Sequence, residues 1–245
     1  MRCAVTRRRD ARSPRMRLLV LLLLGCSSAA GDPHADEGPL VIELFTSQGC
    51  SSCPAAERLL DKLSRAGQLG GRTLAPLAFH VDYWDDLGWA DPYAKPAWTE
   101  RQHQYATALG DHRVYTPELV VAGGAGLVGS QSISAAKAIA SAPRQQKLAA
   151  KAAWTKTTIT VETTPPAGTE VWVAIWEDGT ETKVPRGENA GETLRGDRVV
   201  RALERMPRTG KLTLAIDPAW HAAGAVAFAQ RADKKIIGAT LLPRS

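Results

Sequence analysis

Leu40-Val41-Ile42-Glu43-Leu44-Phe45 is an apolar run, and Cys50-Ser51-Ser52-Cys53-Pro54 follows it shortly afterwards. The first stretch predicts a buried strand, and residues 55–66 have the apolar spacing of a helix. The two thiols therefore lie where a loop leads into a helix. Unpaired backbone N–H groups at a helix N-terminus stabilise a thiolate, which is the species that attacks disulfides. Pro54 suits the first helical turn, where its missing N–H is not needed. The pattern predicts a redox-active dithiol.

Different roles are predicted for the two cysteines. A strand, a C-x-x-C loop and a helix in this order are typical of a thioredoxin-like redox site. Cys50, which precedes the helix, is expected to be the exposed nucleophile, and Cys53 the more buried resolving thiol. Glu43 lies in the strand before the loop. It is either a buried acid that relays protons to Cys53, or a surface carboxylate at a strand edge.

A second part of the site is predicted at Thr116-Pro117. Pro117 directly precedes an apolar run, Glu118 to Ala122, which predicts a strand. A proline that opens a strand in trans is the simple interpretation. Together with the C-x-x-C motif, we interpret Pro117 as a cis-proline opposed to the dithiol. The backbone of Thr116 would then be free to pair with an extended partner segment.

Several segments of the chain together resemble one family. They are Phe45-Thr46-Ser47-Gln48-Gly49-Cys50-Ser51-Ser52-Cys53-Pro54, Tyr83-Trp84-Asp85, Gly88-Trp89, Arg101-Gln102, Tyr115-Thr116-Pro117 and Arg186-Gly187-Glu188-Asn189. The chain resembles uncharacterised secreted bacterial proteins of thioredoxin-like fold that are grouped as a domain of unknown function. The resemblance covers nearly all of the mature chain. It implies a thioredoxin-like fold and export, and it brings no settled substrate.

The expected fold class is an α/β thioredoxin-like domain followed by a smaller all-β, sandwich-like domain. We place the first domain at residues 40–153, with an aromatic-rich insertion at about residues 82–96 and a final helix from Ser134 to Ala150. The second domain, residues 154–245, contains a series of short β-type runs. Asp178-Gly179 lies between two of these runs and is a strong hairpin signal.

The N-terminal residues predict export. Residues 1–25 combine a basic stretch with the apolar run Leu18 to Leu24, which is too short to span a bilayer. This leader ends in Leu23-Leu24-Gly25-Cys26, which resembles a lipoprotein signal whose cysteine is lipidated. A soluble secreted form cut near Ala29 or Ala30 is the alternative. Residues 26–39 are small and polar and predict a flexible tether. We expect a periplasmic protein, attached to the membrane only through Cys26.

The charge of the chain does not indicate nucleic-acid binding. The formal net charge is +6, but residues 1–25 hold seven of the 31 basic and one of the 25 acidic residues. The remainder carries 24 of each, so the basic character belongs to the leader. The expected partners are envelope proteins or small molecules that carry thiols or disulfides. The sequence does not indicate an oligomeric state.

Two other functions use the same thiols. His80, His103 and His112 could join the cysteines in a soft-metal site for copper binding or delivery, although no histidine has a local spacing to the C-x-x-C motif. The third hypothesis, after the oxidoreductase and the soft-metal protein, is a non-catalytic envelope binding module with a structural disulfide. No organic cofactor is predicted, because the glycines at 123–126 are not followed by a helix at the spacing of a dinucleotide-binding loop.

Overall fold

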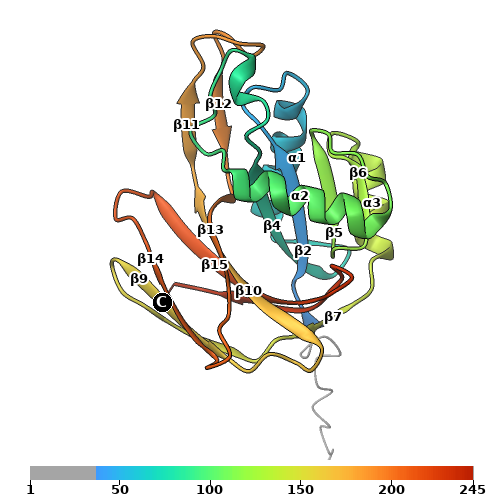
Figure 1. The fold of residues 1–245 in the computed structure, drawn as a ribbon, viewed down its shortest axis with the longest axis vertical. Helices are drawn as coiled ribbons and strands as arrows, with labels where there is room; N and C mark the ends of the chain where they lie inside the picture. Colours follow the sequence, from blue (N-terminus) through green and yellow to red (C-terminus); the bar gives the residue numbers. More distant parts are fainter. Residues whose placement is uncertain (1–36, 245) are drawn as a thin grey trace, which may run out of the picture. The chain divides into compact units, whose positions relative to one another are not determined.

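The structure of this chain is a computed structural model that describes residues 37–244, and it is built mainly from strands (Figure 1). The helices are α1 (Cys53–Ala66), η1 (a 3-10 turn, Asp85–Leu87), α2 (Pro96–Leu109) and α3 (Ser132–Ser141). The strands of the first half are β1 (Glu37–Gly38), β2 (Leu40–Thr46), β3 (Gln68–Leu69), β4 (Arg72–His80), β5 (Glu118–Val121), β6 (Ala125–Val128), β7 (Gln145–Lys147) and β8 (Ala150–Trp154). The strands of the second half are β9 (Thr158–Thr163), β10 (Thr169–Asp178), β11 (Thr180–Lys183), β12 (Thr193–Gly196), β13 (Val199–Arg205), β14 (Lys211–Ala215), β15 (Ala222–Arg231) and β16 (Ile236–Leu242).

Most strands belong to one mixed sheet. Its order is β1-β7-β16-β15-β10-β13-β4-β2-β5-β6, and β3 pairs with β4 beside this path. The β2–β4 and β4–β13 pairs are parallel, whereas β10, β13, β15 and β16 pair with one another in antiparallel fashion. The other two sheets are β11-β12 and β14-β9-β8.

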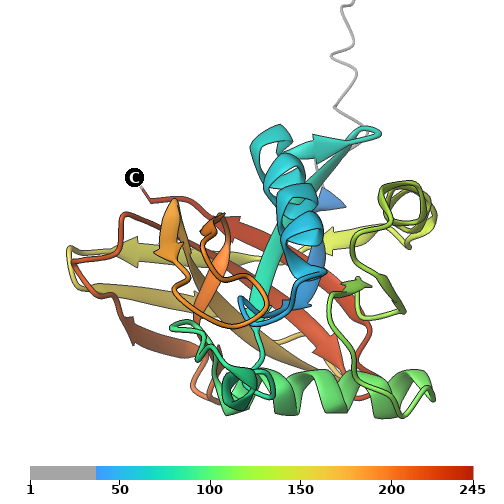
Figure 2. The same ribbon diagram turned by 90° about the horizontal axis from the view of Figure 1, so that it is seen from above.

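The side chains of β2 belong to two apolar clusters, one on each face of the main sheet. Successive residues of a strand point to opposite faces of a sheet. Ile42 and Leu44 join the apolar cluster that contains residues of α1 and α3, and Val41 and Phe45 join the cluster that contains Trp98 and Tyr105 of α2. The helices α1 and α2 accordingly lie on opposite faces of β2 and β4 (Figure 2).

The expected fold class is wrong, because the second half of the chain does not form a separate all-β domain. Its strands continue the main sheet, and β13 joins β4 where the Ala78 N–H donates to the Arg198 carbonyl at 2.8 Å. The described residues, 37–244, all belong to one compact unit. The physical reason is that β10 and β15 are apolar on both faces. Trp176 and Phe228 pack into the same cluster as Phe45. One thioredoxin-like domain followed by another domain therefore does not describe this protein.

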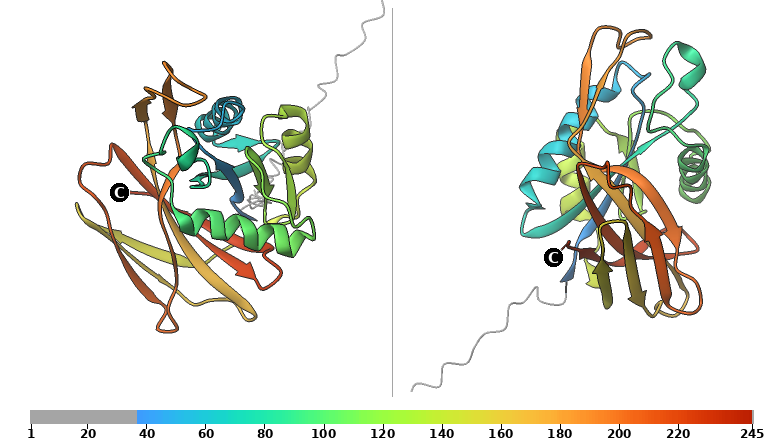
Figure 3. Two further views of the ribbon diagram at one scale, coloured as in Figure 1. Left: turned by 45° about the horizontal axis from the view of Figure 1, so that its top comes forward. Right: turned by 90° about the vertical axis from the view of Figure 1, so that its left-hand side faces the viewer.

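The other face of β10 and β15 carries a second layer. Val171, Val173 and Ile175 point away from the helices and pack against the three-stranded sheet β14-β9-β8, which contributes Ile159 and Val161. Figure 3 shows this sheet at the end of the molecule opposite to the β11-β12 hairpin. These two layers are not the separate sandwich domain that was predicted, because one of them is the sheet shared with the first half.

Two local predictions were also wrong. The helix expected from Ser134 to Ala150 ends at Ser141, and the chain continues through β7 and β8. Ala142 is extended and precedes a proline, whose ring disfavours helix in the residue before it. Asp178-Gly179 does not close a hairpin. It lets the chain leave the main sheet, because β10 pairs with β13 and β15 and β11 pairs with β12.

The predicted leader and most of the predicted tether lie outside residues 37–244, which the structure describes. Because residues 1–36 are not described, export and a lipid at Cys26 remain predictions. At the end of the predicted tether, Glu37 and Gly38 form β1 and pair with β7. No helix within residues 37–244 is long and apolar enough to cross a membrane.

Candidate functional site

Cys50 and Cys53 form a disulfide between the end of β2 and the start of α1. The loop is closed by two backbone hydrogen bonds, from the Cys50 N–H to the Ser47 carbonyl and from the Cys53 N–H to the Cys50 carbonyl, both 3.2 Å. Cys53 is the first residue of α1, and Pro54 occupies its first turn. The Ser52 hydroxyl lies 3.3 Å from Cys50 Sγ. After reduction, the N-terminus of α1 favours a thiolate at this position.

Thr116 and Pro117 lie against the dithiol, 66 residues away from Cys50 in the chain. The Thr116 carbonyl oxygen is 3.9 Å from Cys50 Sγ, and the Thr116–Pro117 peptide bond is cis. The Pro117 carbonyl accepts the Gly129 N–H at 2.9 Å. A Cβ on Gly129 would come within 2.8 Å of Leu44 Cδ1 and 3.2 Å of Ala56 Cβ, so this segment passes close to β2 and α1.

Both cysteines are buried. Cys50 is 1% exposed and Cys53 is fully buried, whereas Ser51 and Ser52 are exposed. The expectation of an exposed Cys50 was therefore wrong for the disulfide form. The reason is tertiary: two segments far away in the sequence cover the loop that carries the motif.

The aromatic-rich insertion provides the first cover. Trp84 Nε1 donates to the Thr116 hydroxyl at 2.8 Å, and a Cβ on Gly49 would lie only 3.0 Å from Trp84 Cβ. Trp89 Nε1 donates to Gln48 Oε1 at 3.3 Å. The insertion thus packs against the dithiol loop, and its indoles are held by polar contacts with both parts of the site.

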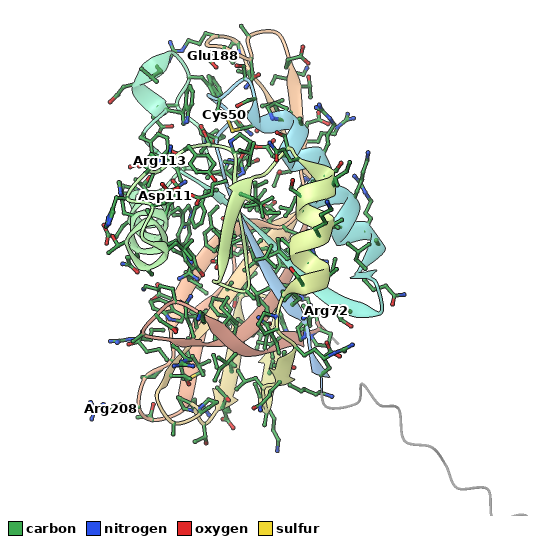
Figure 4. All side chains as sticks on the ribbon, turned by 90° about the vertical axis from the view of Figure 1, so that its right-hand side faces the viewer. Cys50, Arg72, Asp111, Arg113, Glu188 and Arg208 are labelled. Atoms are coloured by element: carbon green, nitrogen blue, oxygen red, sulfur yellow. A yellow bond between two sulfur atoms is a disulfide. The ribbon has the colours of Figure 1, made fainter. Side chains whose placement is uncertain are left out.

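The second cover is residues 184–192, which connect β11 to β12 and are called the cover loop below. Asn189 Nδ2 donates to the carbonyls of Gln48 and Cys50 at 2.8 and 3.1 Å, and Glu188 Oε2 accepts the Ser51 N–H at 2.9 Å. The hydrogen bond from Ser51 lowers the pKa of Glu188. Figure 4 shows Glu188 at the same end of the molecule as Cys50.

The sequence does not indicate that the segment Arg186-Gly187-Glu188-Asn189 contacts the dithiol loop. The only signal was its place among the segments that carry the family resemblance. Gly187 has a φ of 85° and packs against Trp89, where a Cβ would lie 3.1 Å from Trp89 Cβ. The two covers therefore also contact each other.

Glu43 is buried on the sheet face that carries α2. It lies two residues from both Val41 and Phe45, and residues at this spacing on a strand point to the same face. Arg101 Nε lies 2.7 Å from Glu43 Oε1, and the Tyr105 hydroxyl donates to its other oxygen. Burial alone would lower the pKa of Arg101, but the Glu43 carboxylate raises it above its ordinary value. In the described chain no hydrogen bond joins Glu43 to either cysteine. This placement supports an ion pair across the core and not a proton relay to Cys53.

A different polar cluster lies on the α1 side, and the sequence did not indicate it. The Thr46 hydroxyl donates to Glu57 Oε1 at 2.6 Å. His80 Nδ1 lies 2.7 Å from Asp91 Oδ2, which also accepts the Gln48 N–H at 2.7 Å. Burial opposes both charges, but their mutual attraction raises the pKa of His80 and lowers that of Asp91. Burial raises the pKa of Glu57.

The three histidines considered as metal ligands do not meet at the dithiol. His80 pairs with Asp91, while His103 and His112 are exposed on α2 and in the segment after it. Among residues 37–244, no group of three or more His, Cys, Asp and Glu side chains is arranged to hold a metal ion.

Comparisons with known proteins agree with this architecture. A family model described as "Protein of unknown function (DUF1223)" matches residues 41–235. The chain is similar to the crystal structure of protein AGR_C_4864 from Agrobacterium tumefaciens, with 24% identity over 85% of this chain and 96% of that chain and a TM-score of 0.60. It is also similar to HBP35 of Porphyromonas gingivalis, with 16% identity over 84% of this chain and 75% of that chain and a TM-score of 0.56. At these identities both likenesses show the fold alone. No curated protein matches the chain.

Proposed function

This chain belongs to the DUF1223 family, and we propose that it is an exported thiol–disulfide oxidoreductase. The observation that carries the proposal is the position of the Cys50–Cys53 pair. It lies at the N-terminus of α1, with the Thr116 carbonyl 3.9 Å from Cys50 Sγ. Helix N-termini activate thiols, and a second thiol one turn away makes the attack reversible.

The chemistry is an exchange of two electrons. The Cys50 thiolate attacks one sulfur of a partner disulfide and forms a mixed disulfide, and the other partner sulfur leaves as a thiolate. Cys53 then attacks the Cys50 sulfur, loses its proton, and displaces the second partner sulfur. The protein becomes oxidised and the partner becomes a dithiol. The reverse sequence oxidises a partner, and the reduction potential decides between the two directions.

Because Cys50 is buried, the reaction requires a movement that exposes its sulfur. Cys50 is 1% exposed, so a partner sulfur reaches it only when the cover loop or Trp84 moves. The same burial favours one alternative, a structural disulfide that does not react. Thiol exchange of the folded protein distinguishes the two, because a buried structural disulfide is inert.

Export is part of the proposal and rests on the leader. Residues 1–25 have the composition of a secretory signal, and Cys26 follows a lipoprotein-like segment. The envelope is a compartment in which disulfides form and persist. The partners are then envelope proteins or small molecules that contain thiols or disulfides.

Trapping of mixed disulfides tests the function. In Cys53→Ser the attack by Cys50 is kept and the resolving step is lost, so we expect disulfide-linked adducts with envelope proteins on non-reducing gels. Cys50→Ser should give none, and the variant with both cysteines changed to serine is the matched blank. Incubation of the wild-type protein in glutathione buffers gives the potential.

If neither single variant forms adducts and the native disulfide does not exchange with glutathione, the dithiol is structural and the proposal is wrong. Adducts in both single variants would show that Cys50 and Cys53 do not have the separate roles proposed here.

A further inference from the structure

A buried carboxylate lies on the same helix as the resolving cysteine. Glu57 follows Cys53 by four residues on α1, and residues at this spacing are neighbours on a helix surface, about 5–6 Å apart between Cβ atoms. Both side chains belong to the buried face of α1: Cys53 is fully buried and Glu57 is 7% exposed. The two side chains are therefore neighbours on the buried face of α1, at a spacing that one water molecule can bridge.

Glu57 also connects the interior with the surface. A cavity of about 10 Å³ is lined by Glu57, His80 and Gln48 among others, which is room for about one water molecule. A surface cleft of about 500 Å³ is lined by Glu57 together with Ser51, Pro54 and Asn189. Glu57 lines both, and the surface cleft offers a proton on its carboxyl group a route to solvent.

Charged groups from each neighbouring element face Glu57. Arg58 and Asp61 lie on its own helix, His80 on β4 and Asp91 in the loop after η1. Arg195 and Asp197 line the cavity from the β12 side, and Glu192 lines the surface cleft. Burial raises the pKa of Glu57 above its ordinary value, and Asp91 and Asp61 act in the same direction, against His80 and Thr46. Burial raises the pKa of Asp61 to about 6. A carboxyl group with a raised pKa is suited to proton transfer near neutral pH.

We propose that Glu57 is the proton acceptor and donor for the Cys53 thiol, and that it exchanges this proton with solvent through the cleft beside the cover loop. This role rests on the proposed function. As the Cys53 sulfur attacks the mixed disulfide, its proton moves to the Glu57 carboxylate, the bond between Cys50 and the partner sulfur breaks, and the partner leaves as a thiolate. Glu57 then releases the proton to solvent. In the reverse reaction Glu57 protonates Cys53 as it leaves the disulfide.

The test separates the two thiol steps. The reduced protein, with Cys3→Ser and Cys26→Ser so that only the dithiol reacts, is mixed with 5,5′-dithiobis(2-nitrobenzoate). The first thiolate released reports attack by Cys50, and the second reports ring closure by Cys53. We expect Glu57→Gln to slow only the second step, by at least about tenfold at pH 6–7. The difference should vanish above about pH 9, where a thiol ionises without a base.

Two further variants keep the result interpretable. Glu177→Gln removes a buried carboxylate from β10, in the second half of the chain, and should leave both steps unchanged. Glu57→Asp keeps a carboxyl group and should recover part of the second step even if Glu57→Gln folds poorly.

Each outcome of this assay has one interpretation. A wild-type protein that releases one equivalent and no second would overturn the proposed function and the role of Glu57 with it. A normal wild type combined with an unchanged second step in Glu57→Gln would overturn the role of Glu57 alone. A second step slowed equally at all pH values would also overturn it, because that result indicates a packing defect and not a lost base.

Discussion

The two ends of this molecule differ in what they bury. The end that carries the helices and the dithiol, called the dithiol end below, buries several charged side chains, namely Glu43, Glu57, His80, Asp91 and Arg101. The core between β10, β15 and the three-stranded sheet is formed mainly by apolar side chains, although Thr163 of β9 and Glu177 of β10 are also buried. Buried charges are costly even when paired, whereas apolar burial stabilises directly. The difference indicates that the sandwich end stabilises the fold and that the dithiol end keeps ionisable groups at a cost in stability.

The two ends are nevertheless one structure. The strand β10 contributes Val173 to the apolar core and Ala174 to the core shared with α2. The chain then leaves the sheet at Asp178 and forms the β11-β12 hairpin, whose cover loop contacts the dithiol. Residues of the second half thus decide how accessible Cys50 is.

The largest expected effect is at the buried ion pair of the dithiol end. Arg101→Met leaves the Glu43 carboxylate buried without its cation, and this type of change costs about 3–5 kcal/mol. Urea unfolding of the oxidised protein measures it. The matched change at the apolar end, Ile159→Val, should cost only about 0.5–1.5 kcal/mol.

A combined variant, Glu43→Gln with Arg101→Met, should recover part of the loss because no charge remains unpaired. If Arg101→Met costs no more than Ile159→Val, the charges of the dithiol end carry no stability cost of this size, and the contrast between the two ends fails.

A smaller effect is expected where the second half covers the first. Asn189→Ala removes the hydrogen bonds to the Gln48 and Cys50 carbonyls, and each such bond contributes about 0.5–1.5 kcal/mol. If Cys50 reacts through local opening of the cover loop, the change should raise its alkylation rate by about tenfold in the reduced protein. Iodoacetamide labelling at fixed pH measures the rate. An unchanged rate would show that the cover loop does not limit access.

The smallest effect is expected at Glu188, which is exposed and accepts the Ser51 N–H. Its carboxylate opposes the favourable field of the α1 N-terminus. In Glu188→Gln the alkylation rate of Cys50 near neutral pH should rise by less than about threefold, and the gain should shrink in high salt. Glu192→Gln, in the same loop, is the control. A gain of equal size in the control would assign the effect to net charge and not to the contact with Ser51.

The sequence indicated the local parts of this site. The apolar run before Cys50, the helix after Cys53 and the strand after Pro117 lie close to where their patterns place them. Each of these signals is short-range, because periodicity, glycine and proline act on neighbouring residues. The resemblance to a domain of unknown function was confirmed by the family model over residues 41–235, whereas the predicted fold class was wrong.

The sequence did not indicate the contacts between distant segments. Nothing in the alternation of β10 shows that Trp176 packs beside Phe45, so two domains were expected where there is one sheet. Likewise the sequence shows Glu57 only as a polar residue of an amphipathic helix. Its contact with the Thr46 hydroxyl and the cavity that it lines with His80 depend on the tertiary structure.

By itself, the sequence determined a dithiol at a helix N-terminus with a proline segment downstream, since these depend on residue type and spacing. Only the tertiary structure decided that both sulfurs are buried, that Glu43 faces Arg101 and that Asn189 holds the dithiol loop. These features arise from long-range packing of strand faces, and one strand pattern is compatible with several partners until the whole sheet is assembled.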